Sequence, residues 1–140
     1  MAKLRHVAVV VRDLKKATEF YEKAFDMKCA FANENAVYLT DGIMNLALLN
    51  YATVNRPGSK TADGRLGIHH MGFRVDDLKE AQAKVEALGA TFAFDLGDPN
   101  GMNFERKFHD LEGMIFDISE KGWYGALDEP TEKAKEPETV

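Results

Sequence analysis

The pattern of hydrophobic and polar positions along this chain occurs twice. The segment His6–Leu14 (HVAVVVRDL) returns as His70–Leu78 (HMGFRVDDL). Each copy is a short apolar run, typical of a buried strand, which passes through aspartate into a stretch of helical periodicity. The two copies indicate an internal duplication of one structural unit, with a histidine at the same point of each first strand.

The alternation within these two strands separates an apolar face from a face that is more open. Successive strand residues point to opposite sides of a sheet. One face is expected to carry Val7, Val9 and Val11 in the first copy, and Met71, Phe73 and Val75 in the second. The other face is expected to carry His6, Ala8 and Val10, and His70, Gly72 and Arg74. Small residues beside a histidine predict a surface left free for a ligand.

Each strand is followed by a helix that begins after an aspartate, Asp13 or Asp77, which is a good N-cap residue. The apolar positions recur at helical spacing, and all of them are expected in the core. They are Ala17, Phe20, Tyr21, Ala24 and Phe25 in the first helix, and Leu78, Ala81, Val85 and Leu88 in the second. Gly89 is expected to end the second helix.

Three alternating segments follow each helix and predict strands. They lie at about 28–32, 35–40 and 44–49 in the first half, and at about 91–95, 102–109 and 114–119 in the second. Turns are expected at Asp41-Gly42 and Glu112-Gly113. The unit is therefore βαβββ, repeated, and the fold class is α+β.

The domain organisation follows from these units. We expect one domain over residues 1–127, with a first module at about 4–50, a polar connecting loop at 51–67 that could act as a lid, and a second module at about 68–124. Residues 128–140 are charged and contain two prolines, which predicts a disordered tail.

Composition narrows the class of partner. The chain has 140 residues, 45% of them hydrophobic, and a formal net charge of −5. This charge disfavours a nucleic-acid or anionic-membrane partner and favours a small molecule.

Cys29 is the single cysteine, so no internal disulfide is expected. The N-terminal residues lack the apolar core of a signal peptide and no apolar run reaches membrane-spanning length, so we expect a cytoplasmic protein.

The two His-strand-Asp-Leu-helix openings and the segment Asp110–Ile118 (DLEGMIFDI) resemble the vicinal oxygen chelate (VOC) superfamily. This superfamily includes glyoxalase I, methylmalonyl-CoA epimerase, fosfomycin-resistance enzymes and extradiol dioxygenases. The resemblance implies a glyoxalase-like fold, in which two tandem βαβββ modules form a curved mixed sheet around a central cup.

The resemblance also implies one divalent metal ion, held by His6, His70 and Asp117. The duplication favours His70 over His69, because His70 is the residue that aligns with His6. The family usually has glutamate where this chain has Asp117. Its frequent fourth ligand, Glu or Gln, is matched here by Ala47, which disfavours glyoxalase I chemistry. Fe²⁺, Mn²⁺, Ni²⁺, Co²⁺ and Zn²⁺ all suit two imidazoles and one carboxylate.

Three functions are compatible with these residues. The first is a lyase or isomerase that chelates neighbouring oxygens of a small metabolite and stabilises an enolate. The second is an Fe(II)-dependent extradiol-type dioxygenase, and the third is a metal-free binding protein like the bleomycin-resistance proteins.

Candidates for the catalytic base are Glu34, Tyr38, Glu105 and His109, and candidates for substrate binding are Arg74, His69 and Trp123. Homodimerisation is expected from the resemblance.

Overall fold

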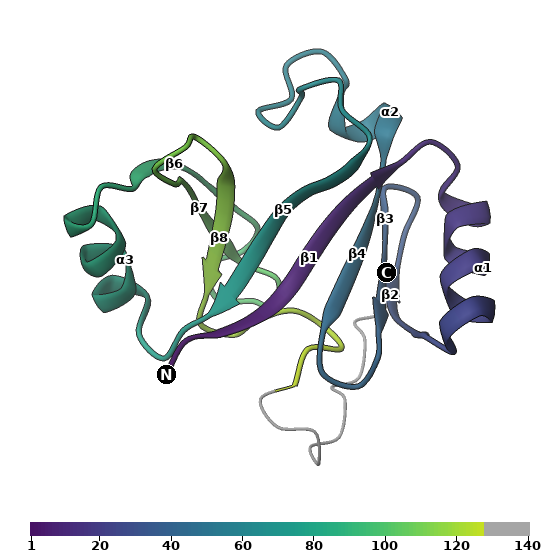
Figure 1. The fold of residues 1–140 in the computed structure, drawn as a ribbon, viewed down its shortest axis with the longest axis horizontal. Coiled ribbons are helices and arrows are strands. Elements are labelled where there is room, and N and C mark those ends of the chain that lie inside the picture. Colours follow the sequence, from purple (N-terminus) through teal and green to yellow (C-terminus); the bar gives the residue numbers. More distant parts are fainter. Residues whose placement is uncertain (128–140) are drawn as a thin grey trace.

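The computed structural model describes residues 1–127, which form one eight-stranded sheet with helices outside it (Figure 1). The first module contains β1 (Lys3–Val11), α1 (Leu14–Phe25), β2 (Lys28–Ala32), β3 (Ala36–Thr40), β4 (Asn45–Asn50) and α2 (Tyr51–Val54). The second contains β5 (Gly67–Arg74), α3 (Leu78–Ala87), β6 (Thr91–Leu96), β7 (Glu105–His109) and β8 (Ile115–Ser119). The predicted tail, residues 128–140, lies outside the described residues.

The order of the strands reflects the duplication. It runs β2-β3-β4-β1-β5-β8-β7-β6, so each module supplies one half of the sheet. The two first strands, β1 and β5, meet in the middle as an antiparallel pair, while β1 pairs with β4 and β5 pairs with β8 in parallel. The sheet curves between α1 at one end and α3 at the other (Figure 1). The predicted architecture, two tandem βαβββ modules that form one curved mixed sheet, is confirmed.

The outer face of each half is filled by its own helix. In the first half, Leu14, Ala17 and Tyr21 of α1 pack with Val9 and Val11 against a buried cluster of Val37, Leu39 and Leu48. In the second, Leu78, Ala81 and Val85 of α3 pack with Met71 and Phe73 against Val75, Phe108, Phe116 and Ile118. Because strand residues alternate, the side chains of opposite parity, including His6, Ala8 and His70, point to the inner face.

The helix starts agree with the sequence, and some core assignments do not. The side chains of Asp13 and Asp77 accept hydrogen bonds from the backbone N–H groups of Lys16 and Glu80 at 3.0 and 2.9 Å. Phe20, Phe25 and Leu88, expected in the core, are 58%, 64% and 73% exposed, and Ala24 is exposed as well. The narrow stripe through Leu14, Ala17 and Tyr21 already covers the sheet, so the two phenylalanine rings lie on the flank of α1.

The connecting segment is also more ordered than predicted. Instead of an irregular loop throughout 51–67, it opens with the short helix α2, for which Asn50 is the N-cap. The Asn50 side chain accepts a hydrogen bond from the Ala52 N–H at 3.1 Å, which stabilises the first turn. Among residues 1–127, no helix is both long and apolar enough for a membrane crossing.

Candidate metal centre

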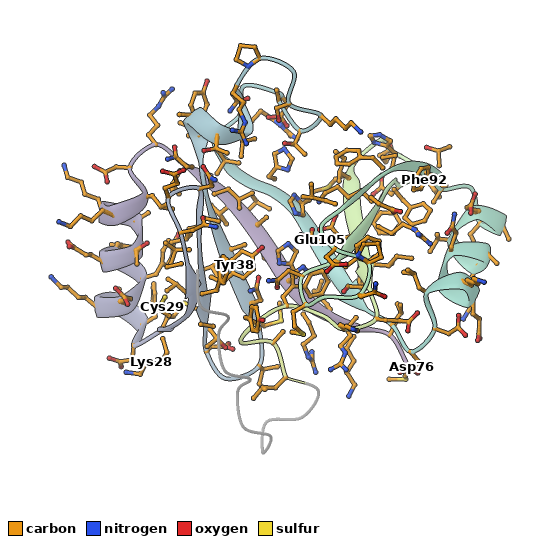
Figure 2. The ribbon with its side chains drawn as sticks, turned by 180° about the vertical axis from the view of Figure 1, so that it is seen from behind. Lys28, Cys29, Tyr38, Asp76, Phe92 and Glu105 are labelled. Carbon is orange, nitrogen blue, oxygen red and sulfur yellow. The ribbon has the colours of Figure 1, made fainter. Side chains whose placement is uncertain are left out.

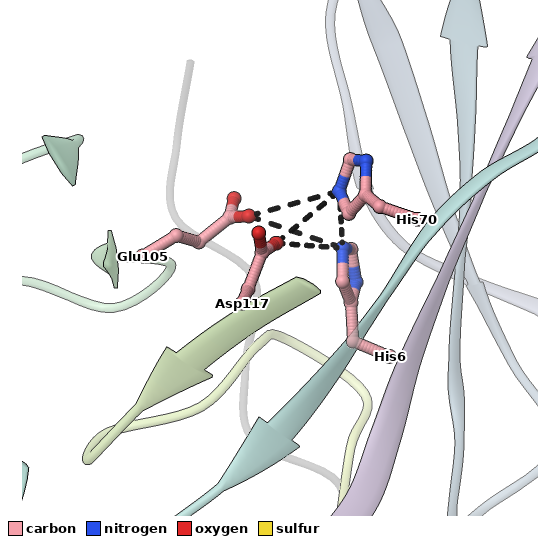
Figure 3. A group of neighbouring side chains, drawn as sticks. All are labelled: His6, His70, Glu105 and Asp117. Atoms are coloured by element: carbon pink, nitrogen blue, oxygen red, sulfur yellow. Dashed lines mark hydrogen bonds and ion pairs between the residues drawn. The ribbon is translucent and has the colours of Figure 1, made fainter. Parts of the chain in front are cut away.

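Four buried side chains meet on the inner face of the sheet, where the two modules join (Figure 3). His6 comes from β1, His70 from β5, Glu105 from β7 and Asp117 from β8, and one ligand atom of each lies within 4.8 Å of the others. The strand register brings them together, because Gly72 pairs with both His6 and Asp117. The three residues proposed as ligands from the sequence are therefore neighbours in space.

The distances between the three proposed ligand atoms suit a small cation. His6 Nε2 lies 3.2 Å from His70 Nε2, and Asp117 Oδ2 lies 3.2 Å from His70 Nε2 and 3.6 Å from His6 Nε2. Atoms about 2.1 Å from one metal ion are about 3.0 Å apart at adjacent octahedral positions and about 3.4 Å apart in a tetrahedron. Asp117 Oδ2 is fully buried and has no hydrogen-bond partner among the described residues. These residues fit a divalent ion.

A hydrogen bond to Asn45 fixes the orientation of His6. The Asn45 amide N–H donates to the Tyr124 carbonyl at 2.9 Å, which turns its Oδ1 toward His6 Nδ1 at 2.6 Å. His6 Nδ1 must then be the protonated ring nitrogen that donates to this oxygen. The lone pair of the neutral imidazole is consequently on Nε2, the atom that faces His70 and Asp117.

A similar hydrogen-bond chain fixes His70 through His69. His69 Nε2 lies 3.1 Å from the Thr61 carbonyl and 3.4 Å from Asp63 Oδ2, and both of these oxygens can only accept. His69 therefore carries its proton on Nε2, and its Nδ1 accepts from His70 Nδ1 at 2.8 Å. His70 Nε2 is left with its lone pair toward the centre. His69, expected from the sequence to contact substrate, thus also orients a proposed ligand.

Replacing His69 with leucine should weaken metal binding about 10- to 100-fold, the usual loss when a residue that orients a metal ligand is removed. Without an acceptor for its Nδ1–H, His70 is no longer held in one tautomer. Isothermal titration with Mn²⁺ measures the affinity, and the ¹⁵N shifts of the imidazole report the tautomer of His70. The matched control is His109→Leu on β7. Unchanged affinity and tautomer in His69→Leu would contradict the proposed orientation of His70.

The surroundings keep both proposed histidine ligands neutral. Burial lowers the pKa of His6 to about 4. Burial, followed by the nearby Lys107 ammonium, lowers the pKa of His70 to about 3. Because a metal ion binds the unprotonated imidazole, both side chains are ready to bind at neutral pH without releasing a proton.

A buried lysine joins the two carboxylates of the centre. Lys107 Nζ donates to Asp117 Oδ1 at 2.8 Å and to Glu105 Oε2 at 3.0 Å, and only 1% of the Lys107 residue is exposed. Burial alone would lower the pKa of Lys107, but the two carboxylates outweigh it and the pKa is raised. Burial and the Asp117 charge raise the pKa of Glu105 to about 7. Lys107 thus binds one oxygen of Asp117 and leaves the other facing the histidines.

Trp123 supports His6 from the side. Its ring stacks on the imidazole with centroids 4.5 Å apart and an interplanar angle of 6°. The stack needs Gly72, because a Cβ atom at that position would lie 2.7 Å from the Trp123 ring and 3.0 Å from the His6 ring. Trp123 is fully buried, so this position supports a packing contact with His6 and not the substrate contact expected from the sequence.

Gly72→Ala should displace both rings, destabilise the protein by about 1–3 kcal/mol and lower its affinity for Mn²⁺. The added methyl group meets the rigid edge of an indole, which cannot move without disturbing His6. Urea unfolding and Mn²⁺ titration measure the two effects, and the fluorescence of the single tryptophan follows the stack directly. If Gly72→Ala is as stable in urea as the wild type and binds Mn²⁺ equally well, the close contact of Gly72 with the rings of Trp123 and His6 is not needed.

A cavity of about 410 Å³ opens above the centre. Its lining includes His6, His70, Glu105, Lys107, His69 and Tyr38. Tyr38 and Glu105 come from different modules and lie in the middle of the molecule, between the two long helices (Figure 2). This volume is in the range of small-molecule sites.

The other candidates from the sequence lie away from this cavity. Glu34 is exposed in the turn before β3, and His109 contacts the Gly113 carbonyl at 3.2 Å. Arg74 donates to the Glu120 carbonyl at 3.1 Å at the far end of β5, beside a different surface hollow. These positions do not support a role for the three residues at the centre, so we leave them out of the proposed site.

The sequence of residues 3–118 matches the family model described as Glyoxalase/Bleomycin resistance protein/Dioxygenase superfamily. The chain belongs to this superfamily. Its sequence is 27% identical over 106 residues to the uncharacterized protein YwbC of Bacillus subtilis, covering 66% of this chain and 76% of that one. The resemblance to the VOC superfamily is thereby confirmed.

Solved structures of this superfamily share the fold. A methylmalonyl-CoA epimerase in complex with methylmalonyl-CoA and NH₄⁺ is similar with a TM-score of 0.68 and 19% identity, over 84% of this chain and 93% of that chain. A variant of homoprotocatechuate 2,3-dioxygenase from B. fuscum is similar with a TM-score of 0.64 and 21% identity, over 86% of this chain and 33% of that chain. At these identities the likeness establishes the fold alone.

Proposed function

We propose that this protein is a divalent-metal-dependent enzyme of the lyase or isomerase type that acts on a small oxygenated metabolite. The decisive observation is the group formed by His6 Nε2, His70 Nε2 and the unpartnered Asp117 Oδ2 beside a cavity. Three electron-rich atoms that face one another in a buried place repel one another, and a cation between them removes that repulsion. The similarity in fold and in length to methylmalonyl-CoA epimerase supports the isomerase type.

His6, His70 and Asp117 would hold the ion. When bound, a divalent ion would chelate two neighbouring oxygens of the substrate and stabilise the charge of an enolate. Metal analysis of the purified protein determines which of Fe²⁺, Mn²⁺, Ni²⁺, Co²⁺ and Zn²⁺ this ion is. Three protein ligands leave positions open for these oxygens.

Glu105 is the proposed acid-base residue. Glu105 lines the cavity, and its Oε2 lies 4.0 and 3.9 Å from the Nε2 atoms of His6 and His70. Burial and the Asp117 charge raise the pKa of this group to about 7 in the protein without a metal ion. A carboxylate in this position can take up a proton from a substrate carbon and return it. Lys107 holds this carboxyl group in place through Oε2.

Tyr38 is the proposed hydrogen-bond donor to the substrate. It lines the cavity from β3, opposite the second module. Burial, together with the charges of Glu105 and Asp117, raises the pKa of its phenol, which therefore stays protonated. A protonated phenol can donate to a substrate oxygen as negative charge develops on it.

A second function, ring cleavage by an Fe(II)-dependent dioxygenase, is favoured by the two-histidine, one-carboxylate set. The likeness in fold to homoprotocatechuate 2,3-dioxygenase is consistent with it. The two functions differ in the metal they require and in their need for oxygen. Exchange of a substrate C–H proton with solvent under anaerobic conditions, with Mn²⁺ or Co²⁺ bound, tests the isomerase type directly.

Homodimerisation, expected from the resemblance to the VOC superfamily, stays a prediction.

A further inference from the structure

The cavity has a second polar region at its exposed end, away from the metal centre. Arg56 and Lys60 lie in the segment between α2 and β5 and line the cavity together with Ser59 and Thr61. Both basic side chains are exposed, whereas the proposed ligands are buried. The cavity therefore joins two separate groups of charges.

Arg56 and Lys60 have no anionic partner among residues 1–127. The Arg56 side chain makes no hydrogen bond or ion pair there, and the contact of the Lys60 side chain is with the Phe94 ring, 5.3 Å from Nζ. The positive charge of this pair is thus not balanced within the described part of the chain.

The carboxylates that line the same cavity are already paired. Asp95 accepts from both Arg106 Nε at 2.8 Å and Arg106 Nη2 at 3.1 Å. Glu105 is bound by Lys107. A ligand in this cavity consequently meets uncompensated positive charge at the exposed end, which favours an anion there.

The cavity also has an apolar wall. Ala8, Leu49, Val54, Phe94 and Leu96 line it. Such a wall suits methylene groups or another apolar segment of a ligand.

We propose that Arg56 and Lys60 form an anion subsite, and that the substrate is an acid with an anionic group separated by an apolar segment from its chelating oxygens. The ammonium and guanidinium groups would bind this distal group, and the chelating end would lie at His6, His70 and Asp117. This inference rests on the proposed function, which supplies the position of the chelating end.

The test compares matched pairs of α-keto acids that differ in the distal carboxylate. Mn²⁺-loaded protein, with its metal content verified, is titrated calorimetrically with α-ketoglutarate and α-ketovalerate, and then with α-ketoadipate and α-ketocaproate. Each pair shares the chelating end and the chain length. The dicarboxylate of at least one pair should bind about tenfold more tightly than its partner, and the preference should shrink at high ionic strength.

Charge reversal assigns the preference to the two basic residues. In the double variant R56E/K60E the preference for the dicarboxylate should disappear, while binding of the monocarboxylate and of Mn²⁺ should be retained. The control K16E/K79E makes the same charge change in the first turns of α1 and α3, where glutamate is compatible with a helix. It should keep the preference.

The outcomes separate the subsite from the proposed function. Equal binding within both pairs, or a preference that persists in R56E/K60E, overturns the anion subsite alone. If Mn²⁺ binds but none of the four acids does, chelation of substrate oxygens at the metal is contradicted, and the subsite is overturned with it.

Discussion

Glu105→Gln should reduce proton exchange at the substrate carbon by about 100-fold or more, while the bound metal is retained. The amide keeps the size of the side chain and can still accept from Lys107, but it cannot take up a proton. The exchange is followed by ¹H NMR in D₂O with Zn²⁺ as the bound ion, because Zn²⁺ is diamagnetic and does not broaden the signals of the substrate. α-Keto acids, which carry protons on the carbon beside the ketone, are the test compounds.

The control for this prediction is Glu34→Gln, which makes the same chemical change in an exposed turn. It should leave the exchange rate as in the wild type. If Glu105→Gln exchanges the proton at the wild-type rate, another residue is the base, and Tyr38 is then the first alternative because it also lines the cavity.

Lys107→Met should destabilise the metal-free protein by about 3–5 kcal/mol, the usual cost of leaving a buried ion pair with one partner missing. Without the ammonium, Glu105 and Asp117 are two buried carboxylates with no cation between them. A divalent ion bound at Asp117 supplies positive charge to the same place. Mn²⁺ should therefore stabilise Lys107→Met more than it stabilises the wild type.

Urea unfolding with and without Mn²⁺ measures both effects of Lys107→Met. Lys79→Met, on the exposed side of α3, is the control and should change stability by no more than about 0.5 kcal/mol. A metal-free Lys107→Met protein as stable as the wild type would show that the two carboxylates do not need the lysine.

The duplication explains why the fold and the two proposed histidine ligands could be predicted from the sequence, whereas Asp117 came from the resemblance to the VOC superfamily. Two copies of one strand-helix opening require two equivalent modules, and they place His6 and His70 at equivalent points of the central strands. The structure pairs Ala8 with His70 and His6 with Gly72, so the two histidines project from adjacent strands to the same inner face. Periodicity and repetition are enough for this part of the site.

The polar neighbours of the ligands could not be found in this way, because they depend on strand register and on contacts distant in the sequence. Lys107 faces Asp117 only because β7 and β8 pair in that register. Asn45 reaches His6 through the parallel pairing of β1 with β4. One signal for Lys107 was available, since its spacing from Glu105 places both on one face of a strand.

Ala47 stands where the family often has a fourth metal ligand, and strand pairing also explains which further carboxylate the site has. The sequence showed no carboxylate in the last strand of the first module, where the family often has a fourth ligand. The structure brings another carboxylate to the group from β7 of the second module. It is that of Glu105, which the sequence offered as a candidate base and which is the proposed acid-base residue, not a ligand. An alignment with the family's fourth ligand does not find it, because Glu105 and Ala47 lie on different strands.

The most direct test of the account is metal analysis of the protein purified anaerobically, beside His6→Ala, His70→Ala and Asp117→Ala, with His109→Ala as the control. The account predicts close to one divalent ion per chain in the wild type and the control, and its loss in the other three variants. Iron as the native ion would favour the dioxygenase over the isomerase. A wild-type protein that binds none of Fe²⁺, Mn²⁺, Co²⁺, Ni²⁺ or Zn²⁺ would contradict both enzymes and favour the metal-free binding protein.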